Sequence, residues 1–135
     1  MSMKRILLVD DHPLLREGLR RLIVADKRLE VCGMAGSVEE ALALVESATP
    51  DLVLTDLTLP GRSGLELIKD LGVSHPEIRV LVLSMHDEAI YGKRVRLAGG
   101  SGYAMKDIAP ELLIEAIHTV LGGGEFPSQA PTRRP

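Results

Sequence analysis

Five short apolar runs, each followed by a longer amphipathic segment, are the feature that most constrains the fold of this chain. The runs predict strands over residues 5–10, 30–35, 51–56, 79–84 and 101–105. Runs of this length that stay apolar throughout are typical of strands covered on both faces. Five strand–helix units in succession predict one parallel sheet with helices on both sides and right-handed crossovers.

The segments between the runs carry helix start signals. These signals are Pro13, the capping-box pairs Ser37 with Glu40 and Ser63 with Glu66, and Pro110. A proline suits the first turn of a helix, and a capping box satisfies two backbone donors there. The fourth helix, expected over residues 87–98, has only a thin apolar stripe.

Composition limits the classes of protein that this chain can represent. Its 135 residues suffice for one domain with a core that needs no disulfide, and the absence of Trp makes that core aliphatic. Cys32 is the single cysteine and is expected to be a small buried side chain. The net charge of -3 gives no basic footprint for nucleic acid, so any contact with DNA would need another part of the protein. No apolar run reaches the length of about 20 residues that a membrane span needs, and no signal-peptide pattern is present, which predicts a cytoplasmic chain.

Polar side chains stand at the ends of these apolar runs. Three of the expected strands end at Asp10, Asp56 and Ser84. Asp11 comes directly after the first strand, and Lys106 directly after the fifth. The carboxyl ends of parallel strands share one edge of a sheet, so these groups should gather there. Three neighbouring carboxylates repel one another, and a bound Mg²⁺ would relieve that repulsion. The cation, the ammonium and the hydroxyl could then receive a phosphoryl group, toward which a carboxylate is a competent nucleophile.

Structural explanations exist for single members of this set. Asp10 or Asp11 could cap the following helix, Ser84 could satisfy local backbone groups, and Lys106 could be an ordinary surface lysine. Asp56 is too far from the next helix to cap it. The scattered histidines are expected to be surface or packing residues. They are His12, His75, His86 and His118.

Four motifs taken together resemble the receiver domain of two-component response regulators. They are "LLVDDHP", "DLVLTDLTLPGRSG", "LVLSMHD" and "SGYAMKD", and the likeness extends over residues 4–124. The stretches "DDHPLLREGL" and "GYAMKDIAPELLIEAI" are similar to the NarL/FixJ (LuxR-type) class. The resemblance implies an α/β, flavodoxin-like (βα)5 fold, with a five-stranded parallel sheet of strand order 2-1-3-4-5 in three α/β/α layers.

The resemblance also implies how the acidic cluster works. Asp56 matches the phosphoacceptor of the family. Asp10 and Asp11 match the acidic pair that binds Mg²⁺, with Asp56 and the backbone carbonyl of Thr58 as the remaining protein ligands. Lys106 matches the lysine that pairs with the phosphoryl group.

A second group of residues matches positions that act after phosphorylation. Ser84 matches the switch hydroxyl, and Tyr103 matches the aromatic residue that reorients with it. Thr58 and His86 occupy the two variable positions that modulate the lifetime of the phosphoryl group.

The same resemblance implies partners. A sensor histidine kinase would supply the phosphoryl group, phosphorylation would favour a homodimer, and DNA would be bound only through a C-terminal helix-turn-helix domain outside this sequence. Residues 4–124 would form the receiver domain, and residues 125–135 a linker-like tail toward that second domain.

Two other classes of function share part of this pattern. A Mg²⁺-dependent phosphohydrolase with an aspartyl nucleophile typically carries a second acid two residues after that nucleophile, where this chain has Thr58. A degenerate receiver that only binds partners would lack the acids, which are all present here. The sequence therefore favours a phosphoacceptor switch, with no enzyme activity beyond its own phosphorylation and dephosphorylation.

Overall fold

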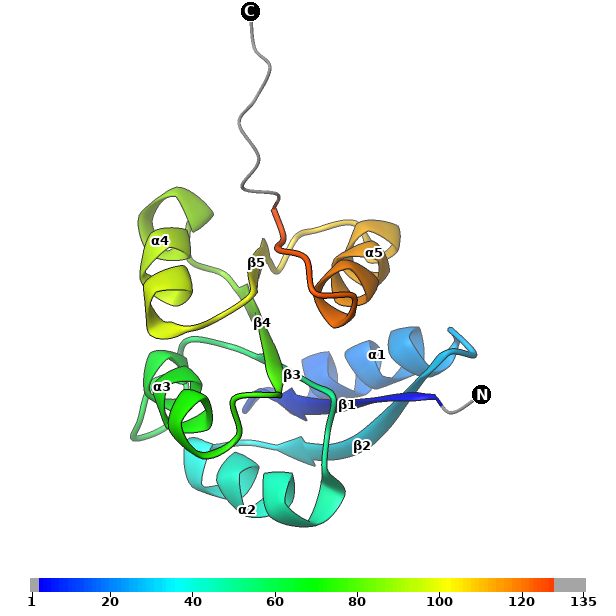
Figure 1. Ribbon diagram of the computed structural model, residues 1–135. Coiled ribbons are helices and arrows are strands. Elements are labelled where there is room, and N and C mark those ends of the chain that lie inside the picture. Colours follow the sequence, from blue (N-terminus) through cyan, green and yellow to red (C-terminus); the bar gives the residue numbers. More distant parts are fainter. Residues whose placement is uncertain (1–2, 128–135) are drawn as a thin grey trace, which may run out of the picture.

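A computed structural model describes residues 3–127 and contains a single five-stranded parallel sheet in the order β2-β1-β3-β4-β5 (Figure 1). The strands are β1 (Lys4–Val9), β2 (Leu29–Ala35), β3 (Leu52–Thr55), β4 (Arg79–Ser84) and β5 (Gly102–Met105). The predicted fold class and strand order are confirmed. Every predicted strand agrees with the observed one to within one residue at each end.

Helices cover both faces of the sheet. They are α1 (Pro13–Val24), α2 (Val38–Ala48), α3 (Gly64–Ser74), α4 (Glu88–Ala98) and α5 (Pro110–Leu121). Buried side chains of α1 and α5 belong to one apolar cluster, and those of α2, α3 and α4 belong to the other. The molecule therefore has the three predicted layers.

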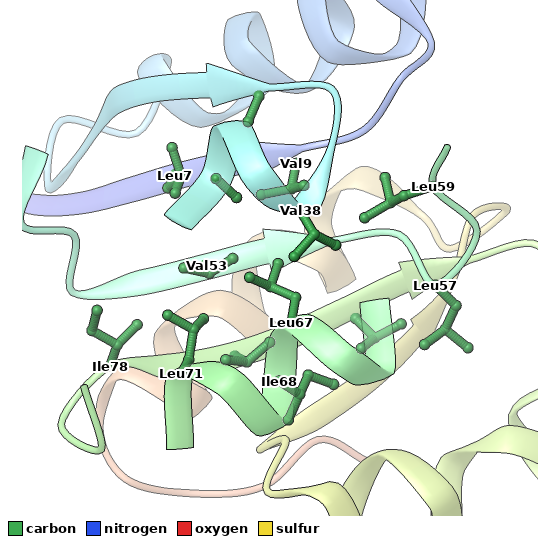
Figure 2. Packing of buried hydrophobic residues seen from close by; sticks show 14 of the residues in the cluster. Leu7, Val9, Val38, Val53, Leu57, Leu59, Leu67, Ile68, Leu71 and Ile78 are labelled. Carbon is green, nitrogen blue, oxygen red and sulfur yellow. The ribbon is translucent and has the colours of Figure 1, made fainter. Parts of the chain in front are cut away.

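The strand side chains divide between these two clusters by simple alternation. In β1, Ile6 and Leu8 belong to the α1 and α5 side, whereas Leu7 and Val9 belong to the α2 and α3 side. Figure 2 shows the second side, where leucine, isoleucine and valine side chains of the helices meet those of the strands. Both faces are buried, which explains why the strand sequences are apolar throughout.

Helix α4 buries few large side chains. Val95 is its only fully buried large side chain, and Ile90 and Leu97 are exposed. This agrees with the thin apolar stripe in its sequence. Its N-terminus is fixed locally, because the Asp87 side chain accepts a hydrogen bond of 2.9 Å from the Ala89 backbone N–H.

The capping signals in the sequence also form. Ser37 accepts a hydrogen bond from the backbone of Glu40, and Ser63 accepts one from the backbone of Glu66. Helix α1 differs, since its N-cap is His12, whose side chain makes no capping hydrogen bond. Neither Asp10 nor Asp11 caps this helix, so the structural explanation for those acids is not what the structure shows.

The chain beyond α5 returns to the free edge of β5. The Tyr103 N–H donates to the Phe126 carbonyl over 2.7 Å, and the Phe126 N–H donates to the Ser101 carbonyl over 3.2 Å. Gly102 makes room for this approach, because a Cβ there would lie 2.9 Å from the Phe126 oxygen. The first part of the expected tail, residues 125–127, thus extends the sheet by one bridge, and residues 128–135 lie outside the described part of the chain.

Helices α1 and α5 are joined at one end through Asp26. The Asp26 carboxylate, on the turn that follows α1, contacts Arg28 at 2.9 Å and His118 of α5 at 2.8 Å. Hydrogen bonds from Arg28, and then from His118, hold the pKa of Asp26 well below its usual range. Across residues 3–127, none of the helices combines the length and the apolar character needed to cross a membrane.

Candidate functional site

Three charged side chains meet at the carboxyl edge of the sheet. Asp10 follows β1, Asp56 follows β3 and Lys106 follows β5. The Lys106 ammonium lies 2.8 Å from Asp56 Oδ2 and 3.1 Å from Asp10 Oδ2. The two carboxylate side chains are only 5% exposed and the lysine side chain 9%, so water screens their interaction poorly.

Lys106 carries its positive charge in this arrangement. Burial alone would lower the pKa of Lys106, but hydrogen bonds to Asp56 and Asp10 outweigh burial and raise that pKa above its ordinary value. The ammonium therefore neutralises part of the negative charge of the pair. Asp56 also accepts a hydrogen bond of 3.3 Å from the Thr58 N–H.

The remaining predicted acid, Asp11, lies nearer the surface. Its side chain is 37% exposed, and Asp11 Oδ1 lies 3.3 Å from Nδ1 of His12. The same imidazole nitrogen lies 2.7 Å from Asp10 Oδ1, and the His12 backbone N–H donates to that oxygen over 2.8 Å. His12 therefore joins the acidic cluster, a contact that the sequence reasoning missed although His12 directly follows the two acids.

The donor atoms of this cluster fit a divalent cation. Asp10, His12 and Asp56 each offer one atom, and the three atoms lie within 4.8 Å of one another. Two of the donors are carboxylate oxygens, which suit Mg²⁺. Asp11 lies next to this group, on its solvent-exposed side.

Ser84 and Tyr103 are connected through one residue of the loop between β4 and α4. The His86 N–H donates to Ser84 Oγ over 3.2 Å, and the Tyr103 hydroxyl donates to the His86 carbonyl over 2.6 Å. Ser84 is fully buried and Tyr103 is 1% exposed. Burial also raises the pKa of the Tyr103 hydroxyl, so the phenol stays protonated at neutral pH.

Thr58 and His86, expected at the two variable positions, contact each other. Thr58 Oγ1 and His86 Nε2 form a hydrogen bond of 3.0 Å, which joins the loop after β3 to the loop after β4. The His86 ring also lies 5.0 Å from the ring of Tyr91 on α4. The His86 side chain is therefore held between the loop after β3 and α4.

Gly64 is a further residue that supports the site and that sequence reasoning missed. It is the first residue of α3, and its N–H donates to the Leu57 carbonyl over 2.8 Å. A Cβ at this position would collide with the backbone carbonyl of Asp56. The available signal was the second glycine of "GRSG", placed just inside a helix start.

Residues 6–118 match the family model of the response regulator receiver domain, and the chain therefore belongs to that family. The predicted likeness to the NarL/FixJ (LuxR-type) class is confirmed as well.

Individual relatives are similar over most of the chain. The DNA-binding transcriptional activator DevR/DosR of Mycobacterium tuberculosis is 44% identical over 90% of this chain and 56% of its own length. The nitrate/nitrite response regulator protein NarL of Escherichia coli is 40% identical over 94% of this chain and 59% of its own length. The chain thus spans little more than half the length of these curated relatives.

Solved structures agree with this assignment. A LuxR-family two-component response regulator from Aurantimonas sp. SI85-9A1 superposes with a TM-score of 0.88 and 38% identity, covering 96% of this chain and 91% of that one. The signal receiver domain of a response regulator from Mycobacterium tuberculosis superposes with a TM-score of 0.86 and 29% identity, covering 91% and 99%.

Proposed function

We propose that this chain is a receiver domain that accepts a phosphoryl group on Asp56 from a sensor histidine kinase and thereby controls transcription. The observation that carries the proposal is the position of Asp56. Its carboxylate lies buried at the carboxyl edge of the sheet, 2.8 Å from the ammonium of Lys106, which also pairs with Asp10. Asp10, Asp11, Asp56 and the Thr58 backbone carbonyl are the proposed ligands of Mg²⁺.

The proposed reaction is an in-line displacement at phosphorus. A carboxylate oxygen of Asp56 forms the new O–P bond, while the P–N bond to the phosphohistidine of the kinase breaks and its electron pair stays with the imidazole nitrogen. Lys106 stabilises the charge on the transferred oxygens, because its ammonium already contacts Asp56. A bound Mg²⁺ supplies further charge neutralisation at the phosphoryl oxygens.

The signal then passes to Ser84 and Tyr103. A phosphoryl group on Asp56 adds negative charge and new acceptor oxygens beside Lys106. The Ser84 hydroxyl turns toward these oxygens and weakens its hydrogen bond with the His86 backbone, which also holds the Tyr103 hydroxyl. Movement of this loop re-packs α4, in which Val95 is the only large side chain that is fully buried.

The phosphoryl group is lost by hydrolysis, and Thr58 and His86 set its lifetime. Their mutual hydrogen bond of 3.0 Å lies beside Asp56, where an attacking water would approach. Thr58 also occupies the position at which a phosphohydrolase would carry its second acid, which supports a slow switch over an enzyme that turns over small substrates.

The proposed output is transcription control by a longer protein. Similar proteins are described as transcriptional regulators, and this chain covers 52 to 59% of such relatives. The acidic net charge of -3 supports DNA contact through a separate helix-turn-helix domain. Phosphorylation would favour a homodimer, which places two such domains on DNA.

Intact-mass measurement after incubation with Mg²⁺ and acetyl phosphate tests the proposal. The native chain should gain the mass of one phosphoryl group, and Asp56→Asn should gain none. Asp70→Asn is the matched control, since Asp70 is a partly exposed aspartate of α3 that pairs with Arg62. An unmodified native chain, or an Asp56→Asn chain that is still modified, would contradict the proposal.

A further inference from the structure

One side chain of the acidic cluster has no part in the proposed phosphoryl transfer, namely the imidazole of His12. Its Nδ1 lies 2.7 Å from Asp10 Oδ1 and 3.3 Å from Asp11 Oδ1. His12 also belongs to the group of residues, with Asp10 and Asp56, whose donor atoms lie within 4.8 Å of one another. The pocket therefore offers a nitrogen donor in addition to carboxylate oxygens.

A nitrogen donor changes which cations a pocket prefers. Mg²⁺ binds oxygen ligands, whereas imidazole nitrogen suits the later divalent ions of the first transition series. We propose that His12 is a ligand through Nδ1, and that it makes this pocket bind Co²⁺ or Zn²⁺ in preference to Mg²⁺. The inference rests on the proposed cation site of the receiver and adds a ligand that decides its selectivity.

The position of His12 allows this role. Its side chain is 61% exposed, so the ring can adjust toward an ion without disturbing the core. It is the N-cap of α1 but makes no capping hydrogen bond, so helix stability does not hold the ring in place. Nδ1 points at two carboxylates, which can only accept, and therefore donates its proton to them. A dication bound between Nδ1 and Asp10 takes the place of that proton.

The other histidines of the described chain are engaged elsewhere. His86 Nε2 is hydrogen-bonded to Thr58 Oγ1. His75 contacts Glu46 and His118 contacts Asp26, away from the carboxyl edge of the sheet. The structure thus assigns the nitrogen ligand to one residue.

Metal binding to the purified chain tests the inference. Dissociation constants for Mn²⁺, Co²⁺ and Mg²⁺ are measured by calorimetry, and the Mn²⁺ complex is examined by pulsed electron paramagnetic resonance for coupling to an imidazole nitrogen. His12→Asn is the informative variant, because asparagine is a good N-cap and retains a donor near Asp10. His75→Asn is the matched control, and His86→Asn tests whether the other histidine beside the pocket supplies the nitrogen.

Native protein should show nitrogen coupling that disappears in His12→Asn and persists in His75→Asn and His86→Asn. His12→Asn should weaken binding of Co²⁺ by about tenfold or more, while Mg²⁺ binding changes less than about threefold. Absence of nitrogen coupling in the native protein, its loss in His86→Asn instead, or an equal loss for all three ions would overturn the inference. In each of these cases Mg²⁺-dependent phosphorylation of Asp56 would still stand, whereas a chain that binds none of the ions would overturn both proposals.

Discussion

Replacing Lys106 by methionine should leave the repulsion between the carboxylates of Asp10 and Asp56 uncompensated. Methionine keeps an unbranched stem of similar length but removes the charge. Oδ2 of Asp56 and Oδ2 of Asp10 lie 2.8 and 3.1 Å from the Lys106 ammonium, so these two oxygens are at most about 6 Å apart. At an effective dielectric constant of about 20, two negative charges at that distance repel by about 3 kcal/mol.

We therefore expect Lys106→Met to lower the free energy of unfolding by about 3 kcal/mol when divalent cations are removed with a chelator. For a domain of this size, that loss corresponds to a fall of about 10 °C in the melting temperature. Saturating Mg²⁺ should restore at least half of the loss, because a dication between the carboxylates does what the ammonium did.

Urea unfolding of the native and variant chains, with chelator and with Mg²⁺, measures both effects. Lys69→Met is the control, because Lys69 is an exposed residue of α3 and its substitution should change stability by less than about 0.5 kcal/mol. A Lys106→Met chain as stable as the native one without cations would refute the reasoning. So would a loss of the same size with and without Mg²⁺, since the carboxylates would then not share the cation.

Two further predictions concern packing and pH. Gly64→Ala should destabilise the chain by about 2 kcal/mol in urea unfolding, because the new Cβ would strike the Asp56 carbonyl. Gly72→Ala is the control in the same helix: it has open space around it and should stabilise the chain by about 0.5 kcal/mol. Equal effects of the two substitutions would disprove the steric argument. Asp26 has a folded pKa held below its unfolded value, so its contribution to stability is present above about pH 4 and is lost as pH falls from there. Asp26→Asn should accordingly be less stable than the native chain at pH 7, and a difference that did not shrink toward pH 3 would contradict this assignment.

The layers and the strands could be predicted from the sequence, because each local signal agrees with the global fold. Fully buried strands require uninterrupted apolar runs, and these runs mark β1 to β5 to within one residue. Helix starts followed from local chemistry, as at Ser37 and Ser63. The thin apolar stripe of α4 corresponds to the few buried side chains of this helix.

The site was only partly predictable. Parallel topology alone brings Asp10, Asp56 and Lys106 to one edge, so their meeting follows from their places in the chain. Side-chain directions do not follow from such places. The turn of His12 into the acidic cluster, and the hydrogen bond between Thr58 and His86, depend on loop conformations that no periodic pattern encodes.

The return of Phe126 to β5 has a consequence for how the molecule meets copies of itself. A free edge strand displays backbone groups on which a foreign strand can assemble, and this is a common route to aggregation. Here the N–H of Tyr103 and the carbonyl of Ser101 are already taken by the chain's own backbone. This pairing of the edge strand depends on Gly102, because a Cβ at that position would lie 2.9 Å from the Phe126 oxygen. Protection of this edge against the addition of a foreign strand therefore requires glycine at residue 102.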